Sequence, residues 1–160
     1  MTSLVFENVW GNPSAPEVAK VQQLWRRHGV LKRDDVIESR SRQIVFVVAN
    51  RDGEVGGVST ARPIQVPFLN NNFFYEFRCF VVPSFRSPGL DSLLALKTKD
   101  FLETLPESGS KYKGIVMLIE NEVLKKQRTK AVWPATGMVF AGYTSQGHHI
   151  RIGYFKGARI

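Results

Sequence analysis

The chain is poor in the residues that build disulfides and metal centres. It has 160 residues but a single cysteine, Cys79, which excludes an internal disulfide. Because Cys79 stands within an apolar run, we expect it to be a small buried hydrophobe in a reducing, cytoplasmic setting. No apolar run approaches the roughly 18 residues of a membrane span. The N-terminus lacks a basic region followed by an apolar core, so we also expect no secretory signal.

Several catalytic motifs are also missing. The chain contains no phosphate-binding Gly-Lys-Ser loop, no Gly-x-Ser-x-Gly elbow and no Cys/His cluster. His148 and His149 are adjacent, so on a strand they point to opposite faces and do not chelate one metal ion. His28 stands alone near a helix end, as a surface or capping residue does. These absences argue against a metalloenzyme, a serine hydrolase and a nucleotide hydrolase, and we expect no metal.

Acidic residues are in short supply. The chain has 22 Lys and Arg against 14 Asp and Glu, which gives a net charge of +8 and a pI of about 9.9. Such a charge attracts polyanions, namely coenzyme A phosphates, acidic peptides or nucleic acid. No zinc-finger or RNA-recognition signature accompanies it, and solvated helix ends explain the basic residues equally well. These residues form two clusters, Arg26, Arg27, Lys32 and Arg33, then Lys125, Lys126, Arg128 and Lys130.

The length suits one domain spanning residues 1–160. Apolar periodicity and turn residues predict an α/β (α+β) fold, a mixed central sheet of about six to seven strands flanked by helices. We expect Pro63 and Pro67 to close the third strand. The predicted strands are 4–10, 43–49, 54–61, 74–82, 113–120, 138–143 and 149–155, with helices from Pro16, within 32–42, from Leu90 and after Asn121.

The segment 74–102 carries the most information. An aromatic and β-branched strand runs to Pro83, and a Ser/Phe/Arg/Ser/Pro/Gly loop then opens onto a helix. This arrangement aims free backbone N–H groups and the positive end of a helix dipole at one point, which makes an anion site. The helical stripe is predicted at Leu90, Leu93, Leu94, Phe101 and Leu105.

The order Val82-Pro83-x-x-Arg86-x-x-Gly89-x-x-Ser92-x-Leu94 resembles the coenzyme A loop of the GNAT superfamily of N-acetyltransferases. The resemblance implies that loop amides cradle the pyrophosphate of acetyl-CoA while the preceding strand pairs with pantetheine. Two residues depart from the family pattern: Asp91 places a carboxylate near the phosphates, and Pro88 removes one amide. The implied coenzyme-binding residues are Phe80, Val81, Val82, Arg86, Ser87, Gly89, Leu90, Asp91 and Asn121, the last matching an asparagine that often follows the fifth strand.

The same resemblance suggests catalytic residues. Glu76 matches a fourth-strand glutamate that some members use as general base, and apolar neighbours would raise its pKa toward neutrality. The alternative is that Glu76 pairs with Arg78 or faces solvent. The family's tyrosine acid is replaced here by a segment starting at Trp133, and an indole does not serve as a proton donor. Tyr143 or Tyr154 would have to substitute.

Together these features imply transfer of an acetyl or other acyl group from acyl-CoA directly to an amine acceptor. Two alternatives stay open, a catalytically degenerate GNAT-like binding domain and a basic nucleic-acid-binding module. The acceptor is open too, and the protein could be a monomer or a homodimer.

Overall fold

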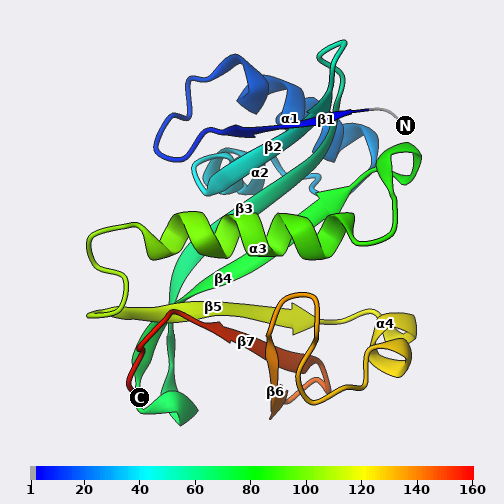
Figure 1. Cartoon of the computed structure of the whole chain (residues 1–160). Coiled ribbons are helices and arrows are strands. Elements are labelled where there is room, and N and C mark those ends of the chain that lie inside the picture. The colour runs from blue at the N-terminus through cyan, green and yellow to red at the C-terminus, as the bar shows by residue number, and fades with distance from the viewer. Residues whose placement is uncertain (1–2) are drawn as a thin grey trace. The chain divides into compact units, whose positions relative to one another are not determined.

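Seven strands form one mixed sheet in the order β1-β2-β3-β4-β5-β7-β6 in the computed structural model, which describes residues 3–160 (Figure 1). β4 and β5 are parallel, and α3 supplies the crossover that a parallel pair requires. The predicted fold class is therefore confirmed. The strands are β1 (Leu4–Asn8), β2 (Ile44–Asn50), β3 (Val55–Val66), β4 (Asn72–Val81), β5 (Tyr112–Ile119), β6 (Val139–Tyr143) and β7 (His149–Tyr154), and the helices are α1 (Pro16–Arg27), α2 (Asp34–Ser41), α3 (Leu90–Glu103) and α4 (Glu122–Gln127).

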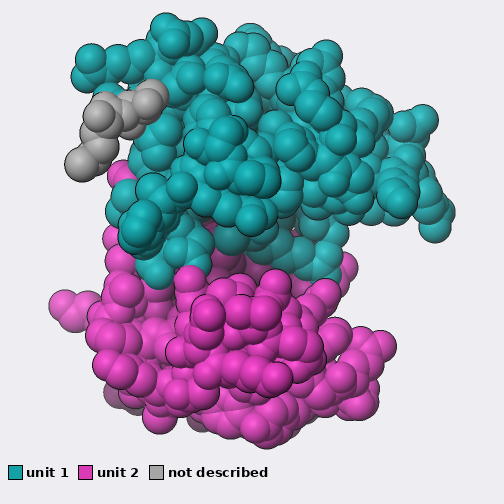
Figure 2. Space-filling model, turned by 90° about the vertical axis from the view of Figure 1, so that its right-hand side faces the viewer, with its two compact units in different colours: residues 1–61, 78–94 teal, residues 62–77, 95–160 magenta. Residues whose placement is uncertain are grey.

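The chain divides into two compact units, coloured separately in Figure 2. The first unit contains the chain up to Ala61 and residues 78–94, and the second contains residues 62–77 and 95–160. β3, β4 and α3 each contribute residues to both units.

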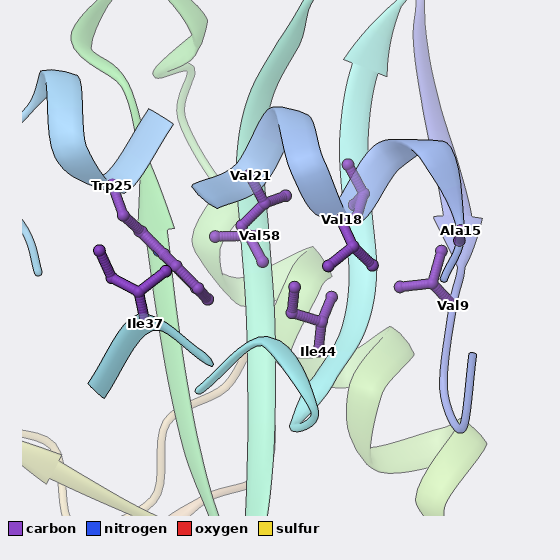
Figure 3. Packing of buried hydrophobic residues seen from close by; sticks show 9 residues of the cluster. Val9, Ala15, Val18, Val21, Trp25, Ile37, Ile44 and Val58 are labelled. Atoms are coloured by element: carbon purple, nitrogen blue, oxygen red, sulfur yellow. The ribbon is translucent and has the colours of Figure 1, made fainter. Parts of the chain in front are cut away.

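The first unit has its core beneath α1. Val18, Val21 and Trp25, which recur at helical spacing on α1, are at most 3% exposed. They pack with residues of α2, β2 and β3 (Figure 3). Gly29, with φ of 64°, follows the helix, a conformation that glycine adopts readily at a helix C-terminus. The full cluster is Val9, Ala15, Val18, Val21, Trp25, Ile37, Ile44, Val47 and Val58.

The second unit is built on β5, β7 and β6, which pair antiparallel. β6 and β7 form a hairpin whose register shifts between Phe140 and Gly142, so Ala141 is an extra residue in β6. Inward-facing apolar residues of these strands pack with β3 and β4 residues of the same unit. The cluster is Val66, Phe74, Val116, Ile150 and Ile152.

Three expectations about individual positions were wrong. β3 does not end at Pro63 but continues to Val66, because a proline is tolerated where the ladder does not need its N–H; the strand does close at Pro67, as predicted. Cys79 is exposed rather than buried, since burial along β4 ends at Phe77 and both following residues face solvent. On α3, Leu93 was expected on the buried stripe but is 43% exposed, whereas Leu102, which was not part of the predicted stripe, is fully buried.

The helices are short. α3, the longest helix among residues 3–160, has 14 residues, whereas a membrane-spanning helix needs about 20. Accordingly, no helix in the described part of the chain could span a bilayer.

Candidate coenzyme-binding loop and neighbouring polar sites

The loop after β4 is anchored to β3 inside the first unit. The N–H of Val82 donates to the carbonyl of Gly56 at 2.8 Å, and a short 3-10 turn, Pro83–Phe85, follows. The ring of Phe85 lies where a side chain on Gly56 would have to sit. A glycine is therefore required at position 56 for the loop to lie against β3 in this way.

The loop leaves several backbone donors available. Within it, Leu90 N–H donates to the Ser87 carbonyl at 3.2 Å, which closes a turn at the start of α3. The N–H groups of Ser87, Gly89 and Ser92 have no hydrogen-bond acceptor among residues 3–160. Gly89 has φ of 80°, a conformation that favours glycine. Three donors beside a helix N-terminus make this segment suited to an anion.

Two side chains of the loop carry charge. Arg86 is exposed, and its Nε donates to the carbonyl of Val81 at 3.0 Å, so the guanidinium is folded back against the end of β4. Asp91 lies in the first turn of α3 and is partly buried. A carboxylate there interacts favourably with the positive end of the helix dipole but repels a phosphate. Asp91, one of the two residues that depart from the family pattern, therefore lies in the first turn of α3.

The strand residues before the loop differ in their side-chain environments. Phe80 packs against the core under α1, with its ring 5.6 Å from that of His28. Val82 is 5% exposed and Leu90 is equally buried. These side chains support the loop, so any contact with a ligand would come from their backbone groups.

Glu76 is a buried carboxylate with a cationic partner in the second unit. It is 4% exposed, which overturns the alternative that it faces solvent. Nε of Arg62, on β3, lies 2.5 Å from Glu76 Oε2, and the Arg62 side chain is half exposed. Burial disfavours the charged carboxylate while the guanidinium favours it, so the two effects oppose each other. Sequence reasoning missed Arg62, because only strand pairing brings it near Glu76.

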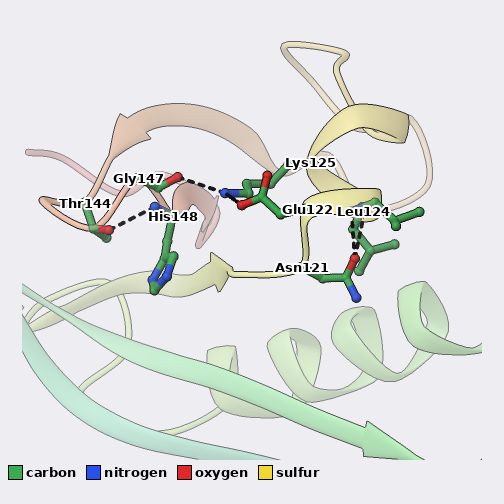
Figure 4. Close-up of polar contacts among 8 residues, drawn as sticks. Asn121, Glu122, Leu124, Lys125, Thr144, Gly147 and His148 are labelled. Carbon is green, nitrogen blue, oxygen red and sulfur yellow. Dashed lines mark hydrogen bonds and ion pairs between the residues drawn. The ribbon is translucent and has the colours of Figure 1, made fainter.

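Asn121 caps α4. Its Oδ1 accepts hydrogen bonds from Val123 N–H at 2.9 Å and Leu124 N–H at 3.1 Å (Figure 4). This is the ordinary role of asparagine at a helix N-terminus. The side-chain carbonyl is thus committed to the helix, and only the amide NH2 is left for a ligand.

The two tyrosines considered as proton donors lie on the β6–β7 hairpin. Tyr143 is 65% exposed and Tyr154 is 37% exposed. Trp133, by contrast, is 7% exposed, and its Nε1 donates to the Arg128 carbonyl at 3.3 Å. Trp133 therefore has a structural role, in agreement with its exclusion as an acid.

The predicted site residues fall into both units. Glu76, Asn121 and Tyr143 belong to the second unit. The predicted residues of the first unit, by contrast, form one continuous segment. They are Phe80, Val81, Val82, Arg86, Ser87, Gly89, Leu90 and Asp91.

Comparison with solved structures places the fold. The chain is similar to an acetyltransferase of the GNAT family from Streptococcus pneumoniae, with a TM-score of 0.61, 11% identity and coverage of 95% of this chain and 99% of that one. A GNAT-family acetyltransferase from Listeria monocytogenes gives 0.57 at 14% identity, covering 94% of each chain. A GNAT-family N-acetyltransferase from Escherichia coli, solved in complex with CoA, gives 0.61 at 13% identity, covering 97% of this chain and 83% of that one. No family model matches the sequence, and no curated protein matches it.

Proposed function

We propose that this chain, which has the GNAT fold, binds an acyl-CoA, with acetyl-CoA as the first candidate, and transfers the acyl group to an amine. Acyl transfer is the activity of the GNAT-family proteins whose fold it shares. The observation that carries the proposal is the set of unpaired N–H groups of Ser87, Gly89 and Ser92 in the loop that opens α3. Backbone donors of this kind, together with a helix dipole, suit a pyrophosphate.

In this proposal the loop and the end of β4 hold the coenzyme. Ser87, Gly89 and Ser92 donate to the pyrophosphate, and Arg86 adds a charge-assisted contact. The registered pairing of β4 with β5 ends at Glu76, so the backbone of Phe80–Val82 lies beyond that ladder. Those backbone groups are assigned to pantetheine, which would have to share the Val81 carbonyl with Arg86 Nε and compete with the bonds that Val82 makes to Gly56 and Phe85.

The transfer requires a base and an acid. The amine nitrogen attacks the thioester carbonyl, a C–N bond forms, the C–S bond breaks, and CoA leaves as a thiolate. Glu76 is the proposed acceptor of the ammonium proton, directly or through water, and Arg62 helps to keep it in the carboxylate form that a base needs. Tyr143 is the proposed donor to the thiolate, and Asn121 offers its free amide NH2 to the coenzyme.

A non-catalytic function has one observation in its favour. Glu76 is already paired with Arg62, which weakens a carboxylate as a base. In that case the chain would bind CoA without turning it over. Release of free CoA thiol in the presence of a panel of small amines and peptide N-termini would separate the two functions.

Binding is tested by calorimetry and thermal unfolding. Acetyl-CoA at about 100 times its Kd should stabilise the folded protein by about 2.7 kcal/mol, or roughly 5–10 °C in Tm. Arg86→Ala should weaken both acetyl-CoA and CoA by about 1.5–3 kcal/mol, because one charge-assisted contact to phosphate is lost. Arg51→Ala, in the exposed β2–β3 turn, serves as the matched charge control.

Absence of any stabilisation by acetyl-CoA or CoA would reject the proposed coenzyme site. Equal affinities of Arg86→Ala and wild type would reject only the role of Arg86. Asn121→Ala tests the amide contact in the same titration, with Asn121→Asp as a variant that keeps the helix cap.

A further inference from the structure

The β6–β7 hairpin exposes a cluster of aromatic rings in the second unit. The rings of Phe140, Tyr143 and His149 lie 5.0–5.3 Å apart in all three pairs and meet edge to face. Phe140 is 37% exposed and Tyr143 is 65% exposed. The extra residue Ala141 produces this arrangement, since the shifted register pairs Phe140 with Arg151 and Tyr143 with His149 on one face.

A buried cation lies against one of these rings, that of Phe140. Arg151 is 1% exposed, and its guanidinium lies 4.5 Å from the centre of the Trp133 ring and 5.4 Å from that of Phe140. Its Nη atoms donate to the carbonyls of Arg128, Lys130 and Ala131 at 2.7–3.0 Å.

The positive charge of Arg151 is not neutralised locally. Its Nε has no partner, and no carboxylate among residues 3–160 forms an ion pair with it. Burial alone lowers its pKa, as expected when a charge is removed from water without a counter-ion. The hairpin therefore has an uncompensated positive charge against the ring of Phe140.

The basic segment after α4 runs alongside the same hairpin. Phe140 N–H donates to the Ala131 carbonyl at 2.8 Å, and Val132 forms a bridge with Val139. Residues 121–151 hold five Lys and Arg against one Glu, which is half of the chain's net charge of +8.

Not every cation of this segment is available. Lys125 pairs with Glu122 at 2.5 Å and donates to the Gly147 carbonyl at 3.2 Å, which ties α4 to the hairpin turn (Figure 4). Lys126 and Lys130 are exposed, and Arg128 is partly exposed. The Arg128 guanidinium lies 5.4 Å from the centre of the Trp133 ring, so Lys126 and Lys130 are the cations that a ligand on this surface would meet.

We propose that this surface, formed by Lys126, Lys130, Phe140 and Tyr143, binds single-stranded nucleic acid. Bases stack on exposed rings whatever their identity, and phosphates follow lysine and arginine side chains. An acidic peptide would engage the cations but would not use the ring faces. A second copy of this chain would bring another basic surface against the first, which like charge opposes. The proposal concerns the second unit alone and does not depend on coenzyme binding, although it shares Tyr143 with the proposed transfer reaction.

The test is fluorescence anisotropy with a labelled thymidine oligonucleotide of about 12 nucleotides, a length within the site sizes of single-strand-binding folds. Tyr143→Ala and Phe140→Ala should each weaken binding about 5- to 100-fold, the loss of one stacked base. Tyr143→Phe removes the hydroxyl but keeps the ring, so it should bind the strand like wild type. The matched ring control is Phe68→Ala, which removes an aromatic side chain that is 57% exposed elsewhere in the unit.

Salt dependence tests the cations. Lys126→Ala and Lys130→Ala should each reduce the slope of log K against log salt by about 0.7, the value for one phosphate of a single strand. Arg159→Ala, an exposed residue near the C-terminus, is the charge control and should leave the slope unchanged. The lysine variants should bind acetyl-CoA like wild type, which separates this result from the coenzyme proposal.

Three outcomes would overturn the proposal. The first is equal affinity for a duplex and the single strand with no effect of Tyr143→Ala, which would leave only non-specific attraction. The second is equal competition by a polyglutamate peptide, which would identify an acidic-peptide surface. The third is a dimer in sedimentation that Tyr143→Ala dissociates, which would identify an interface between copies. Circular dichroism of each variant verifies that the fold is intact.

Discussion

At the scale of single residues, Arg62 and Glu76 determine each other's environment. Glu76 is buried, and Arg62 reaches it from β3 with half of its side chain still in water. A buried carboxylate that loses its cation keeps the cost of desolvation without the compensating attraction. The pair therefore contributes to stability whether or not Glu76 is a base.

Arg62→Ala should lower the free energy of unfolding by about 1.5–3 kcal/mol, the range for a hydrogen bond to a charged group. Urea unfolding at neutral pH measures the change. Arg42→Ala is the matched control, because its pair with Glu38 is 70% and 63% exposed and such pairs contribute only about 0–1 kcal/mol. A double-mutant cycle with Glu76→Gln should show that the two residues are energetically coupled. Additive changes in the free energy of unfolding would contradict this prediction.

Tyr75 is a second residue whose surroundings shift its chemistry. Its ring stacks on that of Tyr112 with centres 4.3 Å apart. Burial, with smaller contributions from Tyr112 and Glu107, raises the pKa of Tyr75 from 10.0 to about 12. The fold thus favours the neutral phenol.

Because the folded pKa of Tyr75 exceeds the unfolded value, its contribution to stability is fully present below pH 10 and is lost as the pH rises toward 12. The free energy of unfolding should therefore fall between pH 10 and 12, and it should fall less steeply in Tyr75→Phe, which has no proton to lose. Urea unfolding at several alkaline pH values measures both slopes. Parallel slopes would show that Tyr75 is not the group responsible.

At the scale of elements, the loop between β4 and α3 depends on two glycines for different reasons. Gly56 on β3 leaves room for the ring of Phe85, while Gly89 adopts a positive φ with open space around it. A side chain at position 56 would clash with Phe85, whereas a side chain at position 89 would strain only the backbone.

Gly56→Ala should destabilise the protein by about 1–3 kcal/mol and weaken acetyl-CoA, because Phe85 and the loop must move. Gly89→Ala should cost about 1–2 kcal/mol through its left-handed backbone, without displacing Phe85. Urea unfolding and calorimetry give both quantities for each variant. If Gly56→Ala retained full stability and affinity, contact between Phe85 and β3 would not position the loop.

At the scale of the whole molecule, the chain passes repeatedly between its two compact units. β3, β4 and α3 each have residues in both. If one unit unfolds, it disrupts β3, β4 and α3, which also contribute residues to the other unit. Unfolding should therefore be cooperative.

We expect one unfolding transition, with equal calorimetric and van't Hoff enthalpies. Trp10 and Trp25 report on the first unit and Trp133 on the second. The variant Trp133→Phe and the double variant Trp10→Phe/Trp25→Phe therefore allow each signal to be followed alone. Coincident fluorescence and circular dichroism curves in urea would confirm cooperativity. Two separated midpoints would show that the units unfold independently.

The sequence by itself determined the elements and the fold. Local periodicity selected the buried face of α1, and a strand, a proline and a glycine loop marked the segment that opens α3. These features depend on residues close in the chain, so spacing and backbone preferences are enough to find them. The helix after Asn121 was predicted from the same kind of local signal, and in the structure Asn121 caps it.

The tertiary structure decided what distant residues do to each other. Arg62 meets Glu76 from 14 positions away, and Arg151 reaches backbone carbonyls 20–23 positions away. The ring cluster exists because one extra residue in β6 shifts the register, and Cys79 is exposed because burial along β4 ends two residues earlier. Strand register and burial arise from long-range packing, which no local spacing encodes.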